Sequence, residues 1–138
     1  MRSEREEASI SVILSIRPRH AQAILDGTKR FEFRRRIFKN AEIDTAYIYV
    51  TSPVQKIVGM IVISRIIETD LPRLWKLSRK YSGLEKEEFL SYFEGLEKGF
   101  AIEIGCVKVF DEPIDPKILL PDFIPPQSFC YSSAEFER

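Results

Sequence analysis

Five short runs of β-branched and aromatic residues limit the folds that this chain of 138 residues can adopt. They cover residues 10–16, 29–34, 45–50, 56–67 and 99–110. Such residues favour strands, because branched and aromatic side chains pack well on a pleated surface. Between positions 70 and 95 the apolar residues instead follow a helical period, which predicts two helices joined near Ser82 and Gly83. Several short strands with a few helices predict an α+β fold with a barrel-like sheet rather than a doubly wound sheet.

The length and composition predict one globular domain. A hydrophobic fraction of 44% and a charged fraction of 30% are those of a folded chain rather than a disordered one. Residues 1–9 are polar and are expected to form a flexible arm, so the predicted domain covers residues 10–138. Neither a membrane-spanning apolar run nor the apolar core of a signal peptide is present in the sequence. We therefore expect a cytoplasmic protein.

The sequence offers few ligands for a metal. It contains two cysteines, Cys106 and Cys130, without a CxxC spacing, and a single histidine, His20. These are too few for a zinc cluster, so we expect neither a metal nor a cofactor. A disulfide is possible, but a reducing compartment favours two free thiols. Cys106 lies within a β run and is expected to be a small buried side chain.

Charge is balanced over the whole chain but unevenly distributed along it. Between positions 17 and 39, eight basic side chains accompany two acidic ones, a local net charge of +6 in a chain whose formal net charge is zero. The basic residues are Arg17, Arg19, Lys29, Arg30, Arg34, Arg35, Arg36 and Lys39. Such asymmetry predicts a local site for an anionic ligand, with phosphates suited to the cluster at positions 35, 36 and 39.

The run KRFEFR predicts on which faces of a strand the side chains of this basic segment lie. Alternation along a strand places Phe31 and Phe33 on one face and Arg30, Glu32 and Arg34 on the other. A carboxylate and a guanidinium two residues apart can pair, or can contact complementary parts of one polar ligand. From the residues alone, an exposed ion pair of small energetic value is the commoner outcome.

Aromatic residues and the histidine have structural interpretations as well. Trp75 lies on the apolar stripe of a predicted helix and is expected to pack in the core. Tyr47 and Tyr49 could stack on bases or form a sheet wall. His20, on a short amphipathic helix that begins at Pro18, is expected at the surface.

The string GTKRFEFR, residues 27–34, resembles the GxKxxExR signature of the ASCH domain. It follows LSIRPRHAQAILD, as that motif follows a strand and a helix in the family. The strings YVTSPVQKIVG and PPQSF resemble an archaeal and bacterial branch of ASCH proteins described as PUA-like regulators. The resemblance extends from about residue 10 to residue 131. It implies a PUA-like β-barrel with flanking helices and a cleft that binds RNA or modified nucleosides.

The resemblance also implies a set of site residues. By motif position, Gly27, Lys29, Glu32 and Arg34 are the signature residues, and Ser52, Gln127 and Ser128 are weaker transfers. With the basic segment added, the candidate ligand-binding residues are Lys29, Glu32, Arg34, Arg17, Arg35, Arg36, Ser52, Gln127 and Ser128. The predicted partner is RNA or a nucleoside.

Two functions fit these residues. We favour a binding module in RNA metabolism, translation or its regulation, because no set of nucleophile, base and orienting group is recognisable. The alternative is a hydrolase, since some ASCH relatives resemble ribonucleases or amidohydrolases of acylated pyrimidine nucleosides. The amidohydrolases carry a threonine three residues after the lysine, where this chain has Glu32. A carboxylate beside Lys29 could still activate a water, so Lys29 and Glu32 are the candidate catalytic residues of an enzyme.

Overall fold

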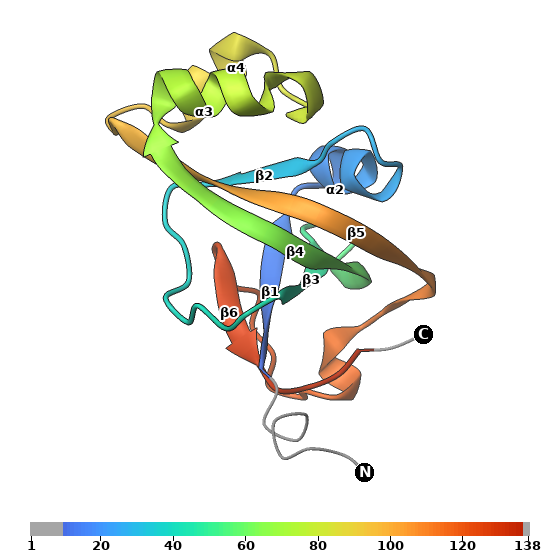
Figure 1. Cartoon of the computed structure of the whole chain (residues 1–138). Coiled ribbons are helices and arrows are strands. Elements are labelled where there is room, and N and C mark those ends of the chain that lie inside the picture. The colour runs from blue at the N-terminus through green and yellow to red at the C-terminus, as the bar shows by residue number, and fades with distance from the viewer. Residues whose placement is uncertain (1–9, 137–138) are drawn as a thin grey trace.

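A mixed six-stranded sheet forms the centre of the computed structural model, which describes residues 10–136 (Figure 1). The strands are β1 (Ser11–Ile16), β2 (Phe31–Arg34), β3 (Thr45–Val50), β4 (Lys56–Asp70), β5 (Lys98–Ile114) and β6 (Phe129–Ser132). Their order is β2-β5-β4-β3-β1-β6; β1 and β3 are parallel, and the other neighbours are antiparallel. The prediction of an α+β fold is confirmed.

The sheet is open in its strand order. Within residues 10–136 no ladder joins β2 to β6, so the closed PUA-like barrel stays a prediction. Register shifts interrupt both the β3–β4 ladder and the long β4–β5 ladder, so the pairing is irregular on either side of β4. At Gly59 a Cβ atom would lie 2.5 Å from the carbonyl oxygen of Lys108. This glycine therefore permits a close backbone approach between β4 and β5.

Three α-helices accompany the sheet: α2 (Pro18–Leu25), α3 (Leu71–Ser78) and α4 (Lys86–Tyr92). Two 3₁₀ turns, η1 (Arg79–Tyr81) and η2 (Pro116–Ile118), complete the elements. Pro18 occupies the first turn of α2, where the missing amide donor leaves no hydrogen bond unmade. A capping box between Glu85 and Glu88 fixes the start of α4. Within the described part of the chain, no helix is long and apolar enough to cross a membrane.

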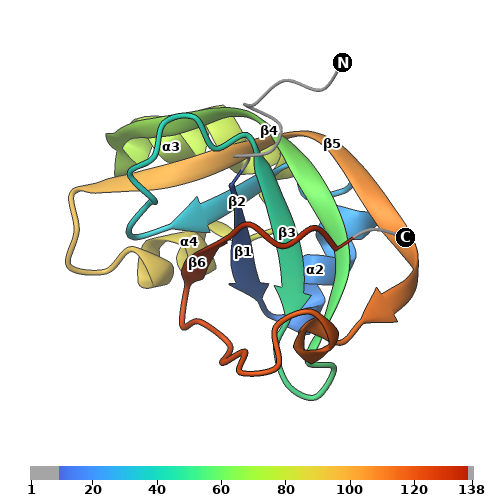
Figure 2. The same cartoon turned by 90° about the horizontal axis from the view of Figure 1, so that it is seen from below.

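The tail after β5 contains a strand that the sequence did not predict. This segment is rich in proline and lies beyond the five predicted strand runs, but β6 pairs antiparallel with β1. Figure 2 shows this tail running around the end of the sheet before β6 reaches its place beside β1. Its last loop thereby comes close to the C-terminal end of β1, where Ser15 N–H donates to the Ser128 carbonyl at 3.0 Å.

An aromatic cluster holds α3 and α4 against β2. Phe33 packs edge-on against Phe89 and Phe93 of the α4 region, with ring centroids 5.2 and 6.0 Å apart. Leu74 of α3 is buried in the same cluster, and Trp75 packs against it as predicted. Because these contacts fix α4 relative to β2, they also fix the space between them.

Four expectations concern residues away from this cluster. Tyr47 and Tyr49 are buried in a second core cluster, which leaves them as wall residues rather than stacking platforms. Both cysteines are free, as predicted. Cys106, however, is exposed, so its expected burial is wrong; it lies on β5 at a position that faces outward. The predicted arm at residues 1–9 lies outside the described residues.

Candidate functional site

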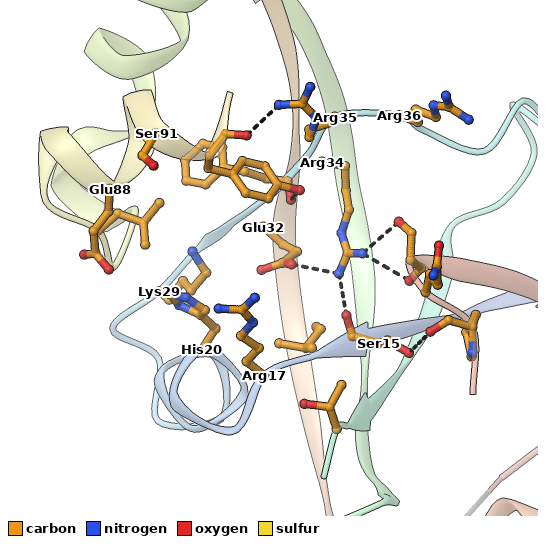
Figure 3. Close-up of a pocket in the computed structure, with 18 of the residues that line it drawn as sticks. Ser15, Arg17, His20, Lys29, Glu32, Arg34, Arg35, Arg36, Glu88 and Ser91 are labelled. Carbon is orange, nitrogen blue, oxygen red and sulfur yellow. Dashed lines mark hydrogen bonds and ion pairs between the residues drawn. The ribbon is translucent and has the colours of Figure 1, made fainter. Parts of the chain in front are cut away.

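A cleft of about 1250 Å³ opens between β2, α4, the start of α2 and the loop before β6 (Figure 3). This volume exceeds the usual range for a small-molecule pocket. Its polar and charged lining residues are Ser15, Arg17, His20, Lys29, Glu32, Arg34, Arg35, Arg36, Thr51, Glu87, Glu88, Ser91, Tyr92, Gln127 and Ser128. They come from five separate segments of the chain, so the site is a product of tertiary structure.

Arg34 joins three of these segments. Its guanidinium donates to Glu32 Oε2 at 2.8 Å, to the Ser15 carbonyl at 3.0 Å, and to the carbonyl and hydroxyl oxygens of Ser128 at 3.1 and 3.0 Å. The Arg34 side chain is only 6% exposed and that of Glu32 only 10%. The sequence-based expectation of an exposed pair is therefore wrong. The loop before β6 and the end of β1 cover this face of β2, which alternation within one strand cannot show.

Lys29 is a buried ammonium at the edge of the cleft. It is 2% exposed, and its Nζ donates to the Ser82 carbonyl at 2.5 Å and lies 5.0 Å from the centroid of the Phe33 ring. Burial lowers the pKa of Lys29 below its usual value, while the nearby carboxylate of Glu32 opposes this shift. Within residues 10–136, Lys29 forms no ion pair. An ammonium with a lowered pKa beside a cleft can take part in ligand contact or proton transfer.

His20 belongs to the same wall although the sequence placed it at the surface. It is half-buried on α2 and lines the cleft. The pKa of His20 is lowered mainly by burial, and the positive charge of Lys29 lowers it further. Its position one turn after Arg17 on a helix that starts at the cleft is the only sequence signal that could have found it.

The opposite wall comes from α4, and sequence reasoning did not include it. Glu88 accepts two hydrogen bonds from Arg19, at 2.8 and 2.9 Å, and this contact holds the pKa of Glu88 at about 2. Glu87 lines the cleft without a hydrogen bond or ion pair to another described side chain. The acidic wall thus faces the basic one across the cleft.

The structure brings most of the predicted set together. The predicted ligand-binding residues that line the cleft are Arg17, Lys29, Glu32, Arg34, Arg35, Arg36, Gln127 and Ser128. Ser52 is not among the lining residues, and its neighbour Thr51 takes that place. Arg35 donates to the carbonyls of Tyr92 and Glu94 at 2.8 and 3.0 Å, so one of its nitrogens already caps the end of α4.

Two arginines of the cleft are free for a ligand. The side chains of Arg17 and Arg36 make no hydrogen bond or ion pair with any residue between 10 and 136. The same part of the chain has no group of three or more His, Cys, Asp or Glu side chains that could hold a metal ion. The charged side chains of the cleft without such a contact are therefore these two arginines and, on the acidic wall, Glu87.

Comparisons with known proteins identify relatives over most of this chain. An ASCH domain-containing ribonuclease from Zymomonas mobilis is 33% identical over 138 residues, covering 96% of this chain and 88% of that protein. Crystal structures of ASCH from Zymomonas mobilis and of one of its point mutants match with a TM-score of 0.82, at 32% and 31% identity. They cover 88% of this chain, and 87% and 89% of their own chains.

A more distant relative is the large ribosomal subunit protein uL22 from Ureaplasma parvum. It is 26% identical over 97 residues, which cover 70% of this chain and 31% of that protein. No family model matches the sequence.

Proposed function

Since this chain belongs to the ASCH family, we propose that it binds single-stranded RNA in the cleft between β2 and α4. One observation carries the proposal: the cleft of a chain without net charge holds two free arginines, Arg17 and Arg36, beside the buried Lys29. Cationic side chains of this kind contact phosphates and position a nucleic acid. The name of the Zymomonas mobilis relative supports RNA as the polymer.

The depth of the cleft favours a single strand over a duplex. Lys29 and Glu32 are almost completely buried, so only a group that enters the cleft can contact them. The base edges of an A-form duplex are paired and stacked, whereas an unpaired base can be turned out and inserted. We therefore assign phosphate contacts to Arg17 and Arg36, and base or ribose contacts to Lys29, Glu32 and Gln127.

Salt dependence of binding tests this assignment. We expect Arg17→Gln with Arg36→Gln to weaken the binding of a fluorescently labelled single-stranded RNA. The slope of log K against log salt should become shallower by about 0.7 for each phosphate that the variant no longer neutralises. The matched control is Arg65→Gln with Arg73→Gln, which removes the same charge from exposed arginines outside the cleft. Equal slopes in the two double variants would contradict a phosphate role for the cleft arginines.

Cleavage of the bound RNA is a second candidate function. It is favoured by the ribonuclease name of the relative and by two cleft bases, His20 and Lys29, whose pKa values burial lowers. A base in the cleft would take the proton of a ribose 2′-hydroxyl, whose oxygen forms a bond to the adjacent phosphorus. The bond from phosphorus to the 5′-oxygen breaks, and that oxygen receives a proton from the second group. The products are a 2′,3′-cyclic phosphate and a 5′-hydroxyl.

The products distinguish cleavage from binding alone. We expect His20→Gln to slow the appearance of cyclic phosphate ends while leaving RNA affinity nearly unchanged, because His20 would act on the proton rather than on the phosphate charge. An RNA with a single 2′-deoxynucleotide at the cleavage position should resist cutting there. If purified protein binds RNA but produces no cyclic ends, the protein is a binding module. We also expect no hydrolysis of acylated cytidine, because Glu32 replaces the threonine and is paired with Arg34.

A further inference from the structure

We infer that Glu32 recognises the exocyclic amino group of an unpaired nucleobase, so that the cleft prefers bases that carry one. The inference rests on the proposed function and specifies which part of the RNA enters the cleft. It starts from an asymmetry within one carboxylate. Glu32 Oε2 accepts from Arg34 at 2.8 Å, whereas Oε1 has no hydrogen-bond partner among the described residues. In Figure 3 the free oxygen points away from Arg34, toward the side of the cleft where Arg17 and Lys29 lie.

This free oxygen is open to the cleft although the rest of the side chain is covered. The Glu32 side chain is 10% exposed, and within residues 10–136 the fully buried side-chain nitrogen or oxygen without a hydrogen-bond partner is Arg34 Nε rather than Glu32 Oε1. A ligand that offers an N–H to Oε1 completes a charge-assisted hydrogen bond. A ligand that offers a carbonyl oxygen instead displaces water from Oε1 and places two acceptors against each other, so the carboxylate loses hydrogen bonds that the ligand does not replace. Cytosine, adenine and guanine carry amino groups, while uracil presents a carbonyl at the position of the cytosine amino group.

The surroundings of Glu32 complement the rest of such a base. Lys29 uses one donor on the Ser82 carbonyl and has two left, and the Arg17 side chain has no partner among the described residues. The Watson–Crick edge of cytosine presents one donor, its amino group, followed by two acceptors, N3 and O2. The free oxygen of Glu32 beside the donors of Lys29 and Arg17 is the complementary arrangement. Uracil reverses the first two positions of this edge, so it would place its carbonyl opposite Glu32.

Binding to the unmodified protein gives the first test. The probes are short oligomers of cytidine, uridine, deoxycytidine and zebularine, a cytidine analogue that has hydrogen in place of the amino group and is otherwise the same size. We expect oligocytidine to bind about tenfold more tightly than oligozebularine, and oligouridine to bind as weakly as oligozebularine or more weakly. Oligodeoxycytidine should keep most of the affinity.

Each other outcome has a definite meaning. Equal binding of oligocytidine and oligozebularine overturns the inference while the proposed RNA-binding function stands. A large loss of affinity with oligodeoxycytidine alone shows that Glu32 accepts from the ribose 2′-hydroxyl, which also overturns it. If none of the oligomers binds, the proposed function fails and the inference fails with it.

Substitution of the carboxylate gives the second test. In Glu32→Gln the amide oxygen is expected to accept from Arg34, because Arg34 has only donors to offer, so the NH₂ group turns toward the cleft. The position then changes from an acceptor to a donor, and the preference for oligocytidine over oligouridine should disappear or reverse. Glu112→Gln is the matched control on the exposed end of β5 and should keep the original preference. An unchanged preference in folded Glu32→Gln overturns the inference, and the zebularine comparison remains decisive if this variant does not fold.

Discussion

Two ion pairs on the same sheet have the same chemistry and opposite surroundings. Arg34 and Glu32 lie 2.8 Å apart with side chains 6% and 10% exposed, and Arg65 and Glu103 lie 2.5 Å apart with side chains 61% and 29% exposed. Arg34 donates to three further acceptors, whereas the pair with Glu103 is the contact that Arg65 makes in the described chain. The residues that cover an ion pair, rather than the distance between its two charged groups, therefore decide whether it organises a site.

The buried pair should be far more sensitive to the removal of one partner. We expect Arg34→Met to reduce the free energy of unfolding by roughly 3–5 kcal/mol, because it leaves the buried carboxylate of Glu32 without its cation. The loop before β6 would also be deprived of two hydrogen bonds at Ser128. Arg65→Met is the matched control and should cost less than about 1 kcal/mol. Urea unfolding of the three proteins measures both values, and similar destabilisation in the two variants would remove the distinction between the pairs.

Neutralising the Glu32 carboxylate that Arg34→Met leaves unpaired should recover part of the lost free energy of unfolding. In Arg34→Met combined with Glu32→Gln, the neutral amide no longer carries the desolvation cost of an unpaired carboxylate. We expect the double variant to be more stable than Arg34→Met alone by about 1–3 kcal/mol, the usual coupling for residues in direct contact. A double variant less stable than Arg34→Met would mean that the hydrogen bonds to Ser15 and Ser128, and not the ion pair, dominate. Urea unfolding on the same scale gives the answer.

The sequence predicted the helices and strands better than it predicted which distant segments bury their side chains. Strand β3 was predicted with the observed bounds, because alternation and turn residues are local signals. β6 was missed because its four residues form a strand through pairing with β1, more than a hundred positions away. The burial of Glu32 and Arg34 was missed for the same reason, since the residues that cover them are distant in sequence. Motif resemblance brought Gln127 and Ser128 into the site without any local signal.

The pH dependence of stability should distinguish the cleft, which contains His20, from the exposed pair of Arg65 and Glu103. The pKa of His20 is lowered in the folded state by burial and by Lys29 and Arg19, while Glu32 and Glu88 oppose the shift. The unfolded chain therefore binds a proton more readily below about pH 6.5, and stability falls as pH drops through the lowered pKa. We expect part of the decrease in stability between neutral and mildly acidic pH to vanish in His20→Gln. The pH dependence of urea midpoints tests this, and Arg65→Met, which touches no histidine, should follow the original protein.

The exposed pair of Arg65 and Glu103 should have the smallest effect on stability. Arg65 and Glu103 lie opposite each other on β4 and β5, so their contact is a cross-strand pair on the outer surface. Solvent screens the attraction, and ordering two long side chains offsets much of the gain. A double-mutant cycle with Arg65→Met and Glu103→Gln should give a coupling energy below about 1 kcal/mol, decreasing further as salt is added. A coupling as large as that of Glu32 and Arg34, or one that salt leaves unchanged, would show that cover alone does not explain the difference between the two pairs.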